Sequence, residues 1–259
     1  MKKVTIKSIL KKKNQKPIVC LTAYSAAIAK IVDKYCDIIL VGDSVGMTLY
    51  GMKSTRNISL DTMIQHARAV KSYSRKCLTV FDMPYKTYAN KFIAYKNAKK
   101  VMRITKCDAI KLEGGKKIIN IVKYLIKKKI PVMGHVGLLP QTSKNFKVKG
   151  KNELQKVKIL NDAKALSRSG AFAIIIECVV ENLAKKITKE ISIPTIGIGA
   201  SKYCDGQILV IDDLLGLSEH YPKFVKRYSN LRKVIDNSVK EYAKDVQLKK
   251  FPFNKNIYK

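Results

Sequence analysis

Short apolar runs alternate along this chain with longer stretches in which apolar residues recur every three or four positions. The runs are rich in Ile, Val and Leu, which is typical of parallel strands buried on both faces, whereas the longer stretches have the spacing of amphipathic helices. The runs predict eight strands, at residues 17–22, 37–41, 77–81, 109–112, 130–134, 171–176, 194–198 and 207–211. The stretches between them predict helices at residues 26–35, 60–73, 91–104, 118–128, 162–169 and 183–190.

Alternating strands and helices build a parallel sheet, which either closes into a barrel or stays open and doubly wound. Eight such units within 259 residues favour the closed (β/α)8 TIM barrel of the α/β class. The length and the 46% hydrophobic content suit one full core. We therefore expect residues 1–259 to form a single barrel domain with a C-terminal helical tail, whose helix is predicted at residues 231–246.

Polar side chains stand where several of the predicted strands end. Asp43 and Ser44 follow the second strand, and Asp82 and Glu113 follow the third and the fourth. Because the carboxyl ends of barrel strands open at one mouth, these side chains should converge there. Buried carboxylates side by side are costly unless a cation or a proton compensates their charge. Three oxygen ligands in one place predict a site for a hard divalent metal ion.

Three further residues belong to the same predicted mouth. Lys111 lies two positions before Glu113 and faces the same side of the strand, where it can neutralise negative charge and bind a substrate carboxylate. His135 and Glu177 follow the fifth and sixth strands. His135 has glycines nearby on both sides and is either a hydrogen-bonded wall of the site or a ligand. Cys178 should point to the opposite face, so we do not assign it as a nucleophile.

The formal net charge of +33 raises the question of a nucleic-acid partner. Only seven of the 52 basic residues are Arg, and the lysines are spread along the whole chain. No RNA-binding, zinc-finger or helix-turn-helix pattern accompanies them. We therefore expect solvated lysine faces, which can steer anionic small molecules to the protein, and no nucleic-acid partner.

Other sequence features narrow the class of protein. No apolar run of membrane-spanning length and no secretory leader is recognisable, which predicts a soluble cytoplasmic protein without a membrane partner. Six cysteines without a C-x-x-C pair predict buried, reduced thiols. The stretch G-I-G-A-S-K at residues 197–202 begins like a dinucleotide-binding fingerprint but lacks its final glycine, so we set it aside.

Several blocks of sequence now stand in a recognisable order between about residues 5 and 226. They are L-T-A-Y, L-V-G-D-S-V-G-M, L-D-x-M-I-x-H, D-M-P-Y, K-L-E-G-G, G-H-V-G-L-L-P-Q, I-I-E-C-V and I-G-I-G-A-S-x-x-x-D-G-Q-I-L-V. By these blocks the chain resembles the ketopantoate hydroxymethyltransferase (3-methyl-2-oxobutanoate hydroxymethyltransferase) family of pantothenate biosynthesis. The resemblance implies a barrel similar to the phosphoenolpyruvate and isocitrate lyase group, assembled as a homodecamer.

The resemblance also implies a reaction. A hydroxymethyl group would pass from the co-substrate 5,10-methylenetetrahydrofolate to 3-methyl-2-oxobutanoate, through an enolate stabilised by Mg²⁺, giving 2-dehydropantoate and tetrahydrofolate. Glu177 would be the general base, and Ser44 and Lys111 would bind the carboxylate of the oxoacid. The Mg²⁺ ligands implied are Asp43, Asp82 and Glu113, the last either directly or through water. The substrate-binding residues implied are Asp43, Ser44, Asp82, Lys111 and His135.

Three positions depart from the family pattern. Ser25 stands where the family usually has Asp, Ser201 where it usually has Gly, and Lys86 where it usually has a small or apolar residue. Ser201 puts the backbone shape of its turn in question, and Lys86 is expected to alter the rim of the site. None of the three is a proposed metal ligand.

Two rival functions remain open from the sequence. A metal-dependent carbon–carbon lyase of the isocitrate lyase type shares enolate chemistry, but such enzymes usually carry a K-K-C-G-H-like loop that this chain lacks. A lysine-rich nucleic-acid-binding protein on a barrel that has lost its activity is the second rival. The intact spacing of every proposed ligand argues against it.

Overall fold

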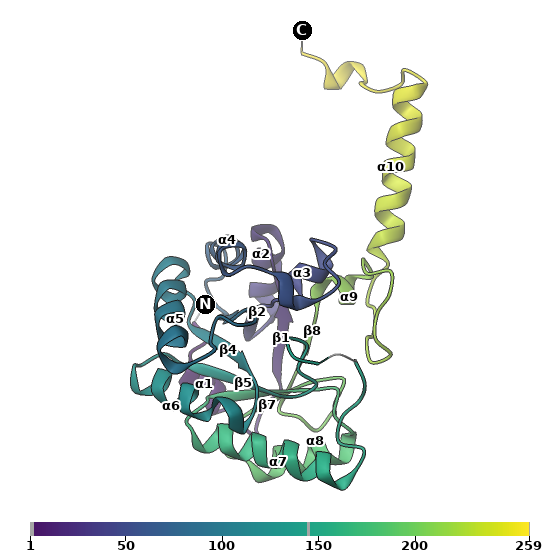
Figure 1. The fold of residues 1–259 in the computed structure, drawn as a ribbon. Helices are drawn as coiled ribbons and strands as arrows, with labels where there is room; N and C mark the ends of the chain where they lie inside the picture. Colours follow the sequence, from purple (N-terminus) through teal and green to yellow (C-terminus); the bar gives the residue numbers. More distant parts are fainter. Residues whose placement is uncertain (1–2, 144–145, 259) are drawn as a thin grey trace. The chain divides into compact units, whose positions relative to one another are not determined.

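The computed structural model describes residues 3–143 and 146–258. The chain divides into two units, Met1–Val210 and Ile211–Lys259. In the first unit eight parallel strands close into a barrel in chain order, with β8 pairing back to β1 (Figure 1). This order confirms the predicted barrel and excludes the open sheet. The strands are β1 Ile18–Thr22, β2 Ile38–Val41, β3 Leu78–Asp82, β4 Ala109–Glu113, β5 Val132–Gly137, β6 Ala173–Glu177, β7 Thr195–Ile198 and β8 Gly206–Leu209.

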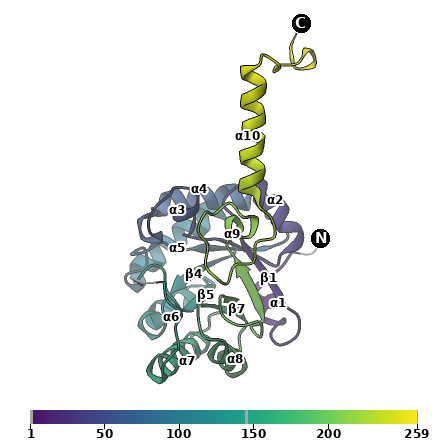
Figure 2. The ribbon, with the colours of Figure 1, turned by 90° about the vertical axis from the view of Figure 1, so that its right-hand side faces the viewer.

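The longer helices of the first unit alternate with the strands and form an outer layer around them (Figures 1 and 2). They are α2 Ala26–Tyr35, α4 Leu60–Lys71, α5 Lys91–Thr105, α6 Ile119–Lys127, α7 Glu153–Arg168 and α8 Glu181–Glu190. Shorter elements lie between them, namely α1 Ile6–Leu10, α3 Val45–Thr48 and the single 3-10 turns η1 Thr55–Asn57 and η2 Lys116–Ile118.

Side chains from the barrel strands form one buried apolar cluster, which includes Ile38 of β2, Met133 of β5 and Ile208 of β8. Ile9 of helix α1 belongs to the same cluster and is fully buried. Its burial explains why this short helix holds its place before the first strand. The apolar core leaves the carboxyl ends of the strands to the polar residues described below.

Helix α7 is the largest error of the sequence prediction, which started it at residue 162. The helix begins nine residues earlier, where the side chain of Asn152 accepts a hydrogen bond from the backbone N–H of Gln155 at 2.9 Å. Leu154 and Val157 in its first turns are exposed. The apolar spacing of a buried face therefore starts only at Ile159, which is why the periodicity missed the first turns.

The end of the eighth strand was also predicted wrongly. The apolar run at 207–211 is read as one strand, but β8 ends at Leu209. Ile211 begins the short helix α9 Ile211–Leu215 of the second unit. A run of apolar residues does not by itself mark the point where extended backbone becomes helical.

Two of the departures from the family pattern are explained by local structure. Ser25 caps helix α2, because its side chain accepts a hydrogen bond from the backbone N–H of Ile28 at 3.4 Å. The backbone φ of Ser201 is not positive, so its position does not require glycine. Its hydroxyl accepts a hydrogen bond from the backbone N–H of Tyr203 at 3.1 Å, which stabilises the turn before β8.

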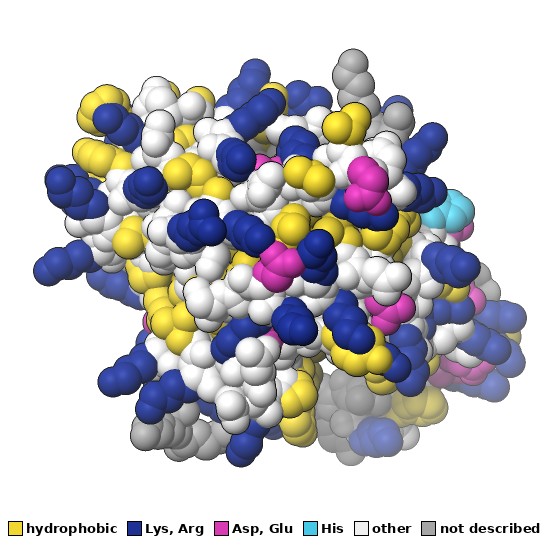
Figure 3. Space-filling view, turned by 90° about the horizontal axis from the view of Figure 1, so that it is seen from below, with side chains coloured by type: hydrophobic (Ala, Val, Ile, Leu, Met, Phe, Trp, Pro, Cys, Tyr) yellow, Lys and Arg dark blue, Asp and Glu magenta, His cyan; other side chains and the backbone are white. Residues whose placement is uncertain are grey.

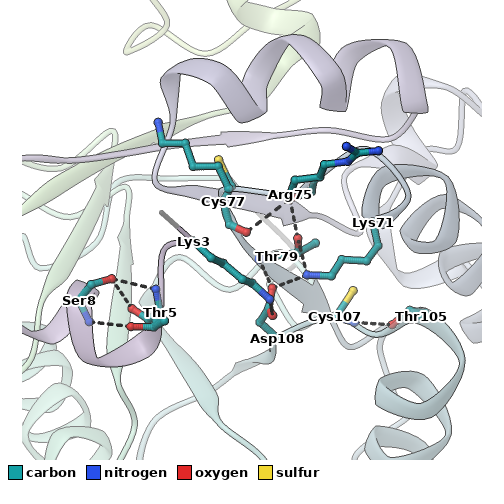
Figure 4. A network of polar contacts seen from close by, with 12 residues as sticks. Lys3, Thr5, Ser8, Lys71, Arg75, Cys77, Thr79, Thr105, Cys107 and Asp108 are labelled. Atoms are coloured by element: carbon teal, nitrogen blue, oxygen red, sulfur yellow. Dashed lines mark hydrogen bonds and ion pairs between the residues drawn. The ribbon is translucent and has the colours of Figure 1, made fainter. Parts of the chain in front are cut away.

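Asp108, which precedes β4, joins three segments on the amino-terminal side of the barrel (Figure 4). One of its oxygens accepts from Lys3 Nζ at 2.6 Å, and the other accepts from Lys71 Nζ at 2.5 Å and from the backbone N–H of Thr79 at 2.9 Å. Burial alone would raise the pKa of Asp108, but these donors outweigh it and the pKa lies below its usual value.

Asp33 in helix α2 plays a similar part beside the loop that precedes β3. Its carboxylate accepts hydrogen bonds from the backbone N–H groups of Arg75 at 3.1 Å, Lys76 at 3.0 Å and Cys77 at 2.7 Å. Burial acts to raise the pKa of Asp33, yet the three N–H donors leave it lowered. Both oxygens are therefore used up within the fold.

The second unit contains α9, the helix α10 Leu231–Gln247 and the turn η3 Asn254–Asn256. Asn230 caps α10 by accepting from the backbone N–H of Lys233 at 3.3 Å, and no residue of this helix is buried. The helix lies where the sequence predicted the tail. That residues 1–259 make a single domain stays a prediction.

On the face shown in Figure 3, Lys and Arg side chains are scattered among polar and apolar ones. Five of the six cysteines are buried, as predicted, and Cys178 is partly exposed. Within the described part of the chain, none of the helices has the length and apolar character needed to span a membrane.

Candidate active site

The structure brings all the predicted site residues to the carboxyl ends of neighbouring strands. Strand register explains how: Asp82 of β3 stands opposite Lys111 of β4, and Glu113 of β4 stands opposite His135 of β5. Glu177 ends β6 and pairs with the last residue of β5. Asp43 and Ser44 follow directly after β2. The parallel register therefore sets these side chains side by side around one mouth.

Lys111 is the central cation of this mouth. Its Nζ donates to Asp82 Oδ2 at 2.8 Å and lies 3.5 Å from Glu113 Oε1, and the residue is only 4% exposed. Burial would lower the pKa of Lys111, but the carboxylates of Asp82, Glu113 and Asp43 outweigh it and hold the pKa above its ordinary value. The ammonium group is therefore charged and partly compensates three acids, as the sequence predicted.

Asp43 and Asp82 form an incompletely compensated pair. The backbone N–H of Asp43 donates to Asp82 Oδ2 at 3.2 Å, while Asp82 Oδ1 is buried without a hydrogen-bond partner among the described residues. Burial raises the pKa of both carboxyls, and their proximity to other acids adds to the effect. A buried oxygen without a donor is costly, which is the expected feature of a site that awaits a cation.

Glu113 is compensated more fully than its two neighbours. Its Oε1 faces Lys111, and its Oε2 accepts a hydrogen bond from the backbone N–H of Gln141 at 3.1 Å. Burial would raise the pKa of Glu113, but Lys111, His135 and that N–H group lower it overall. Glu113 therefore already has partners on both oxygens.

Gln141 is a residue of the site to which sequence reasoning gave no role. It is fully buried, and its side-chain amide donates to Asp43 Oδ2 at 2.8 Å and to the carbonyl oxygen of Met83 at 3.0 Å. The hydroxyl of Tyr88 donates to Gln141 Oε1 at 2.5 Å. Gln141 thus positions Asp43 with its side chain and Glu113 with its backbone. Its place in the G-H-V-G-L-L-P-Q block was the only available signal.

His135 lies between two acids. Nδ1 is 3.5 Å from Glu113 Oε1 and Nε2 is 3.3 Å from Glu177 Oε2, although neither nitrogen has a well-aligned hydrogen bond. Burial and Lys111 act to lower the pKa of His135, but the two glutamates raise it to about 9. His135 is therefore a charged wall between the two glutamates, whereas Glu177, with its side chain 17% exposed, is open to the mouth.

The glycines near His135 have a structural cause. A Cβ atom at Gly134 would approach a side-chain carbon of Leu166 to 2.9 Å, and one at Gly137 would approach the carbonyl oxygen of Glu177 to 2.3 Å. Gly137 also has a φ of +96°, which L side chains rarely adopt. The close approach that the sequence indicated is therefore made by the protein itself.

Ser44 is held by a second hydroxyl. Its Oγ lies 2.7 Å from the hydroxyl oxygen of Tyr24, which is buried at the end of the loop after β1. The ring nitrogen Nδ1 of His66 lies 2.7 Å from the carbonyl oxygen of Tyr24. Tyr24 therefore links the serine to helix α4 and limits where the serine hydroxyl can point.

The three predicted metal ligands differ in how well they fit a metal ion. Across residues 3–143 and 146–258, no three His, Cys, Asp or Glu side chains converge closely enough to hold a metal ion between them. Both oxygens of Glu113 already have partners, Lys111 Nζ and the backbone N–H of Gln141. Asp43 and the unpartnered Oδ1 of Asp82 fit as direct ligands. Glu113 fits the alternative in which it acts through water.

Solved structures with the same fold have very different sequences. Phosphonopyruvate hydrolase in complex with oxalate and Mg²⁺ aligns with a TM-score of 0.64 at 12% identity, covering 100% of this chain and 92% of that one. A 2,3-dimethylmalate lyase, described as a member of the PEP mutase/isocitrate lyase superfamily, aligns with a TM-score of 0.62 at 12% identity, covering 94% and 88%. These likenesses show that the barrel shares the fold of these two proteins and nothing beyond the fold.

Similarity in sequence shows the family of the chain as well as its fold. The 3-methyl-2-oxobutanoate hydroxymethyltransferase of Pelagibacter ubique is 54% identical over 253 residues, covering 98% of each chain. The enzyme of the same name from Bartonella tribocorum is 48% identical over 263 residues, covering 100% of this chain and 97% of the relative. A model of the family described as ketopantoate hydroxymethyltransferase matches residues 3–254. The chain therefore belongs to the ketopantoate hydroxymethyltransferase family.

Proposed function

We propose that the mouth of the barrel binds 3-methyl-2-oxobutanoate, activates its C3 carbon as an enolate and adds to it the one-carbon unit of 5,10-methylenetetrahydrofolate. The reaction class follows from the family: the chain is a 3-methyl-2-oxobutanoate hydroxymethyltransferase that forms ketopantoate for pantothenate biosynthesis. Methylenetetrahydrofolate as its co-substrate follows from the same identity. The assignment of roles to individual residues is our proposal.

The observation that carries the proposal is the pair Asp43 and Asp82, which are buried side by side and have one oxygen, Asp82 Oδ1, with no partner among the residues that the structure describes. Carboxylate oxygens of this kind suit Mg²⁺, and phosphonopyruvate hydrolase, which has the same fold, was solved with oxalate and Mg²⁺. We assign Asp43 and Asp82 as direct ligands and Glu113 as a ligand through water. When bound, Mg²⁺ stabilises negative charge developing on the oxygens of the oxoacid.

Lys111 and Ser44 are assigned to the carboxylate of the oxoacid. The Lys111 ammonium is charged and buried, which makes its attraction for an anion strong. When the Tyr24 hydroxyl donates to Ser44 Oγ, the Ser44 hydroxyl keeps its own proton and can donate it to the carboxylate of the oxoacid. His135 belongs to the same mouth, where its ring nitrogens lie 3.5 Å from Glu113 Oε1 and 3.3 Å from Glu177 Oε2.

Glu177 is assigned as the general base. Its carboxylate is more accessible than those of Asp43, Asp82 and Glu113, and His135 Nε2 at 3.3 Å orients it. It removes the proton from C3 of the oxoacid. The resulting carbon nucleophile bonds to the methylene carbon of the folate as one of the two C–N bonds of that carbon breaks. Water supplies the hydroxyl oxygen as the second C–N bond breaks. The C3 proton and one proton of water go to the two freed nitrogens, which gives tetrahydrofolate and 2-dehydropantoate.

The base assignment is tested by a half-reaction that needs no folate. In D₂O with Mg²⁺, the wild-type protein should exchange the C3 proton of 3-methyl-2-oxobutanoate for deuterium, as followed by NMR. Glu177→Gln should slow this exchange by about a hundredfold or more, because a general base contributes at least that much. The matched control is Glu181→Gln in the first turn of α8. Exchange at the wild-type rate in Glu177→Gln would show that another group is the base.

Removal of divalent metal by a chelator should abolish turnover, and Mg²⁺ should restore it. The homodecameric assembly and the cytoplasmic location stay predictions. The two rival functions gain no support, because full-length similarity is to hydroxymethyltransferases and likeness to a lyase extends to the fold alone.

A further inference from the structure

A cleft of about 620 Å³ lies on the first unit and is built from three loops. Its described lining includes Lys53 and Arg56 after β2, Tyr85 and Lys86 after β3, and Phe146 after β5. All three loops leave the carboxyl ends of their strands, which is the end that carries the candidate active site. The cleft therefore belongs to the rim of the barrel mouth.

The cleft carries positive charge without compensation. Lys53, Arg56 and Lys86 all line it, and none of its described lining residues is acidic. None of the three forms an ion pair with a carboxylate in the described part of the chain, in contrast to Lys111 in the mouth, which contacts two. Three cations that converge on one concave surface repel one another, so an anionic ligand would stabilise them.

The Arg56 cation is held in place rather than free to swing into solvent. Its Nη2 donates to the Tyr85 hydroxyl at 3.0 Å, and its guanidinium carbon lies 4.5 Å from the centroid of the Tyr85 ring. The Ser54 hydroxyl accepts a hydrogen bond from the backbone N–H of Arg56 at 3.2 Å. A preorganised cation loses less entropy when it binds an anion.

Lys86 is one of the positions where the chain departs from its family pattern, and its backbone is unusual. Its φ is +66°, in the left-handed region that favours glycine and asparagine. Its Nζ lies 5.7 Å from the centroid of the Tyr85 ring, which places the ammonium on the same aromatic side chain as Arg56. The departure therefore adds a third cation to the cleft.

The cleft adjoins the proposed metal site along the chain. Tyr85 follows Asp82 by three residues, and their Cα atoms can be separated by at most about 11 Å. Ser143 in the cleft follows Gln141 by two residues, and the Gln141 side chain contacts Asp43. An elongated ligand that reacts in the mouth can thus extend into the cleft, where the three cations favour an anionic far end.

A reduced folate has this shape and charge. Its reactive methylene carbon is at the pterin end, and its glutamate carboxylates are at the other end, beyond an aromatic ring. We propose that Lys53, Arg56 and Lys86 bind the carboxylates of the glutamate tail of the folate co-substrate. The inference rests on the proposed function. Phe146, 60% exposed, is placed to contact the aromatic ring of the same molecule.

The proposal predicts a preference for folates with several glutamates. Each added γ-linked glutamate adds one carboxylate, and the cleft offers three cations. The wild-type enzyme should therefore have a higher kcat/KM for the triglutamate of 5,10-methylenetetrahydrofolate than for the monoglutamate. The preference should weaken as salt is raised, because the cations are exposed and salt screens them.

The variant to compare is the double substitution Arg56→Gln/Lys86→Asn. Asparagine tolerates the left-handed backbone at position 86, so the substitution removes charge without new strain. The preference for the triglutamate should fall about fivefold to twentyfold, as for the loss of two exposed charge pairs. The KM for 3-methyl-2-oxobutanoate and the rate of deuterium exchange at its C3 should stay unchanged. Lys123→Met, which removes one exposed positive charge from helix α6, is the surface-charge control.

The outcomes separate this inference from the function on which it rests. If the wild-type protein turns over no folate, the proposed function itself fails. If the wild type turns over both folates without preference, or the double variant keeps the full preference, the tail site is wrong while the function stands. An equal loss of preference in Lys123→Met would also overturn it, because the effect would then come from the overall charge.

Discussion

Buried or half-buried carboxylates lie at both ends of this barrel, and their hydrogen-bond partners differ. At the amino-terminal side, Asp33 and Asp108 have both oxygens occupied by backbone N–H groups or lysines, and their pKa values are lowered. At the carboxyl-terminal mouth, Asp43 and Asp82 share too few donors, one Asp82 oxygen has none among the described residues, and their pKa values are raised.

Acids that stabilise the fold and acids that serve the site differ in their hydrogen-bond partners rather than in their burial. An acid whose lone pairs all face internal donors contributes to the free energy of folding. An acid left with an unused buried lone pair costs stability and is kept for a ligand that the fold itself does not provide. Substitutions at the two ends should therefore affect different quantities.

The largest effect is expected for Asp43→Asn. The amide keeps an oxygen for the hydrogen bond from Gln141 but loses the charge for Mg²⁺, so kcat should fall by about a thousandfold. The midpoint of thermal unfolding without metal should change little. Added MgCl₂ should raise this midpoint for the wild type but not for Asp43→Asn. Activity within tenfold of wild type would contradict the assignment.

The second effect is expected for Asp33→Asn and concerns stability. The asparagine would turn its NH₂ group toward backbone N–H donors that both carboxylate oxygens now accept. The free energy of unfolding in urea should fall by about 2–4 kcal/mol, while kcat of the folded enzyme stays at the wild-type value. A large loss of kcat with unchanged stability would mean that the two ends are not separated in this way.

The smallest effect concerns the pH dependence of stability. Because the folded-state pKa of Asp108 lies below its usual value, its contribution is fully present above that usual value and is lost as pH falls through the lowered one. The difference in unfolding free energy between wild type and Asp108→Asn should therefore be largest near neutral pH and shrink in acid. Asp61→Asn, which removes an exposed pair with Lys100, is the control. A difference that grows in acid would contradict the sign.

Much of the fold could be predicted because its signals are local. Each strand is a short apolar run, and each longer helix shows its own apolar face, as in α2, which was predicted with its observed bounds. The errors fall where the local signal is weak. Helix α7 begins with exposed apolar residues, and the helices α1, α3 and α9 are too short to show a period.

The pattern of residues along the chain predicted the barrel, the mouth and the seven side chains that meet there, because strand alternation and parallel register place residues at strand ends without reference to distant contacts. Only the tertiary structure decided how those side chains share charge. Gln141 reaches Asp43 across 98 positions, and the basic cleft joins three separate loops. Such contacts depend on how the closed barrel brings distant loops together, so no local pattern in the chain contains them.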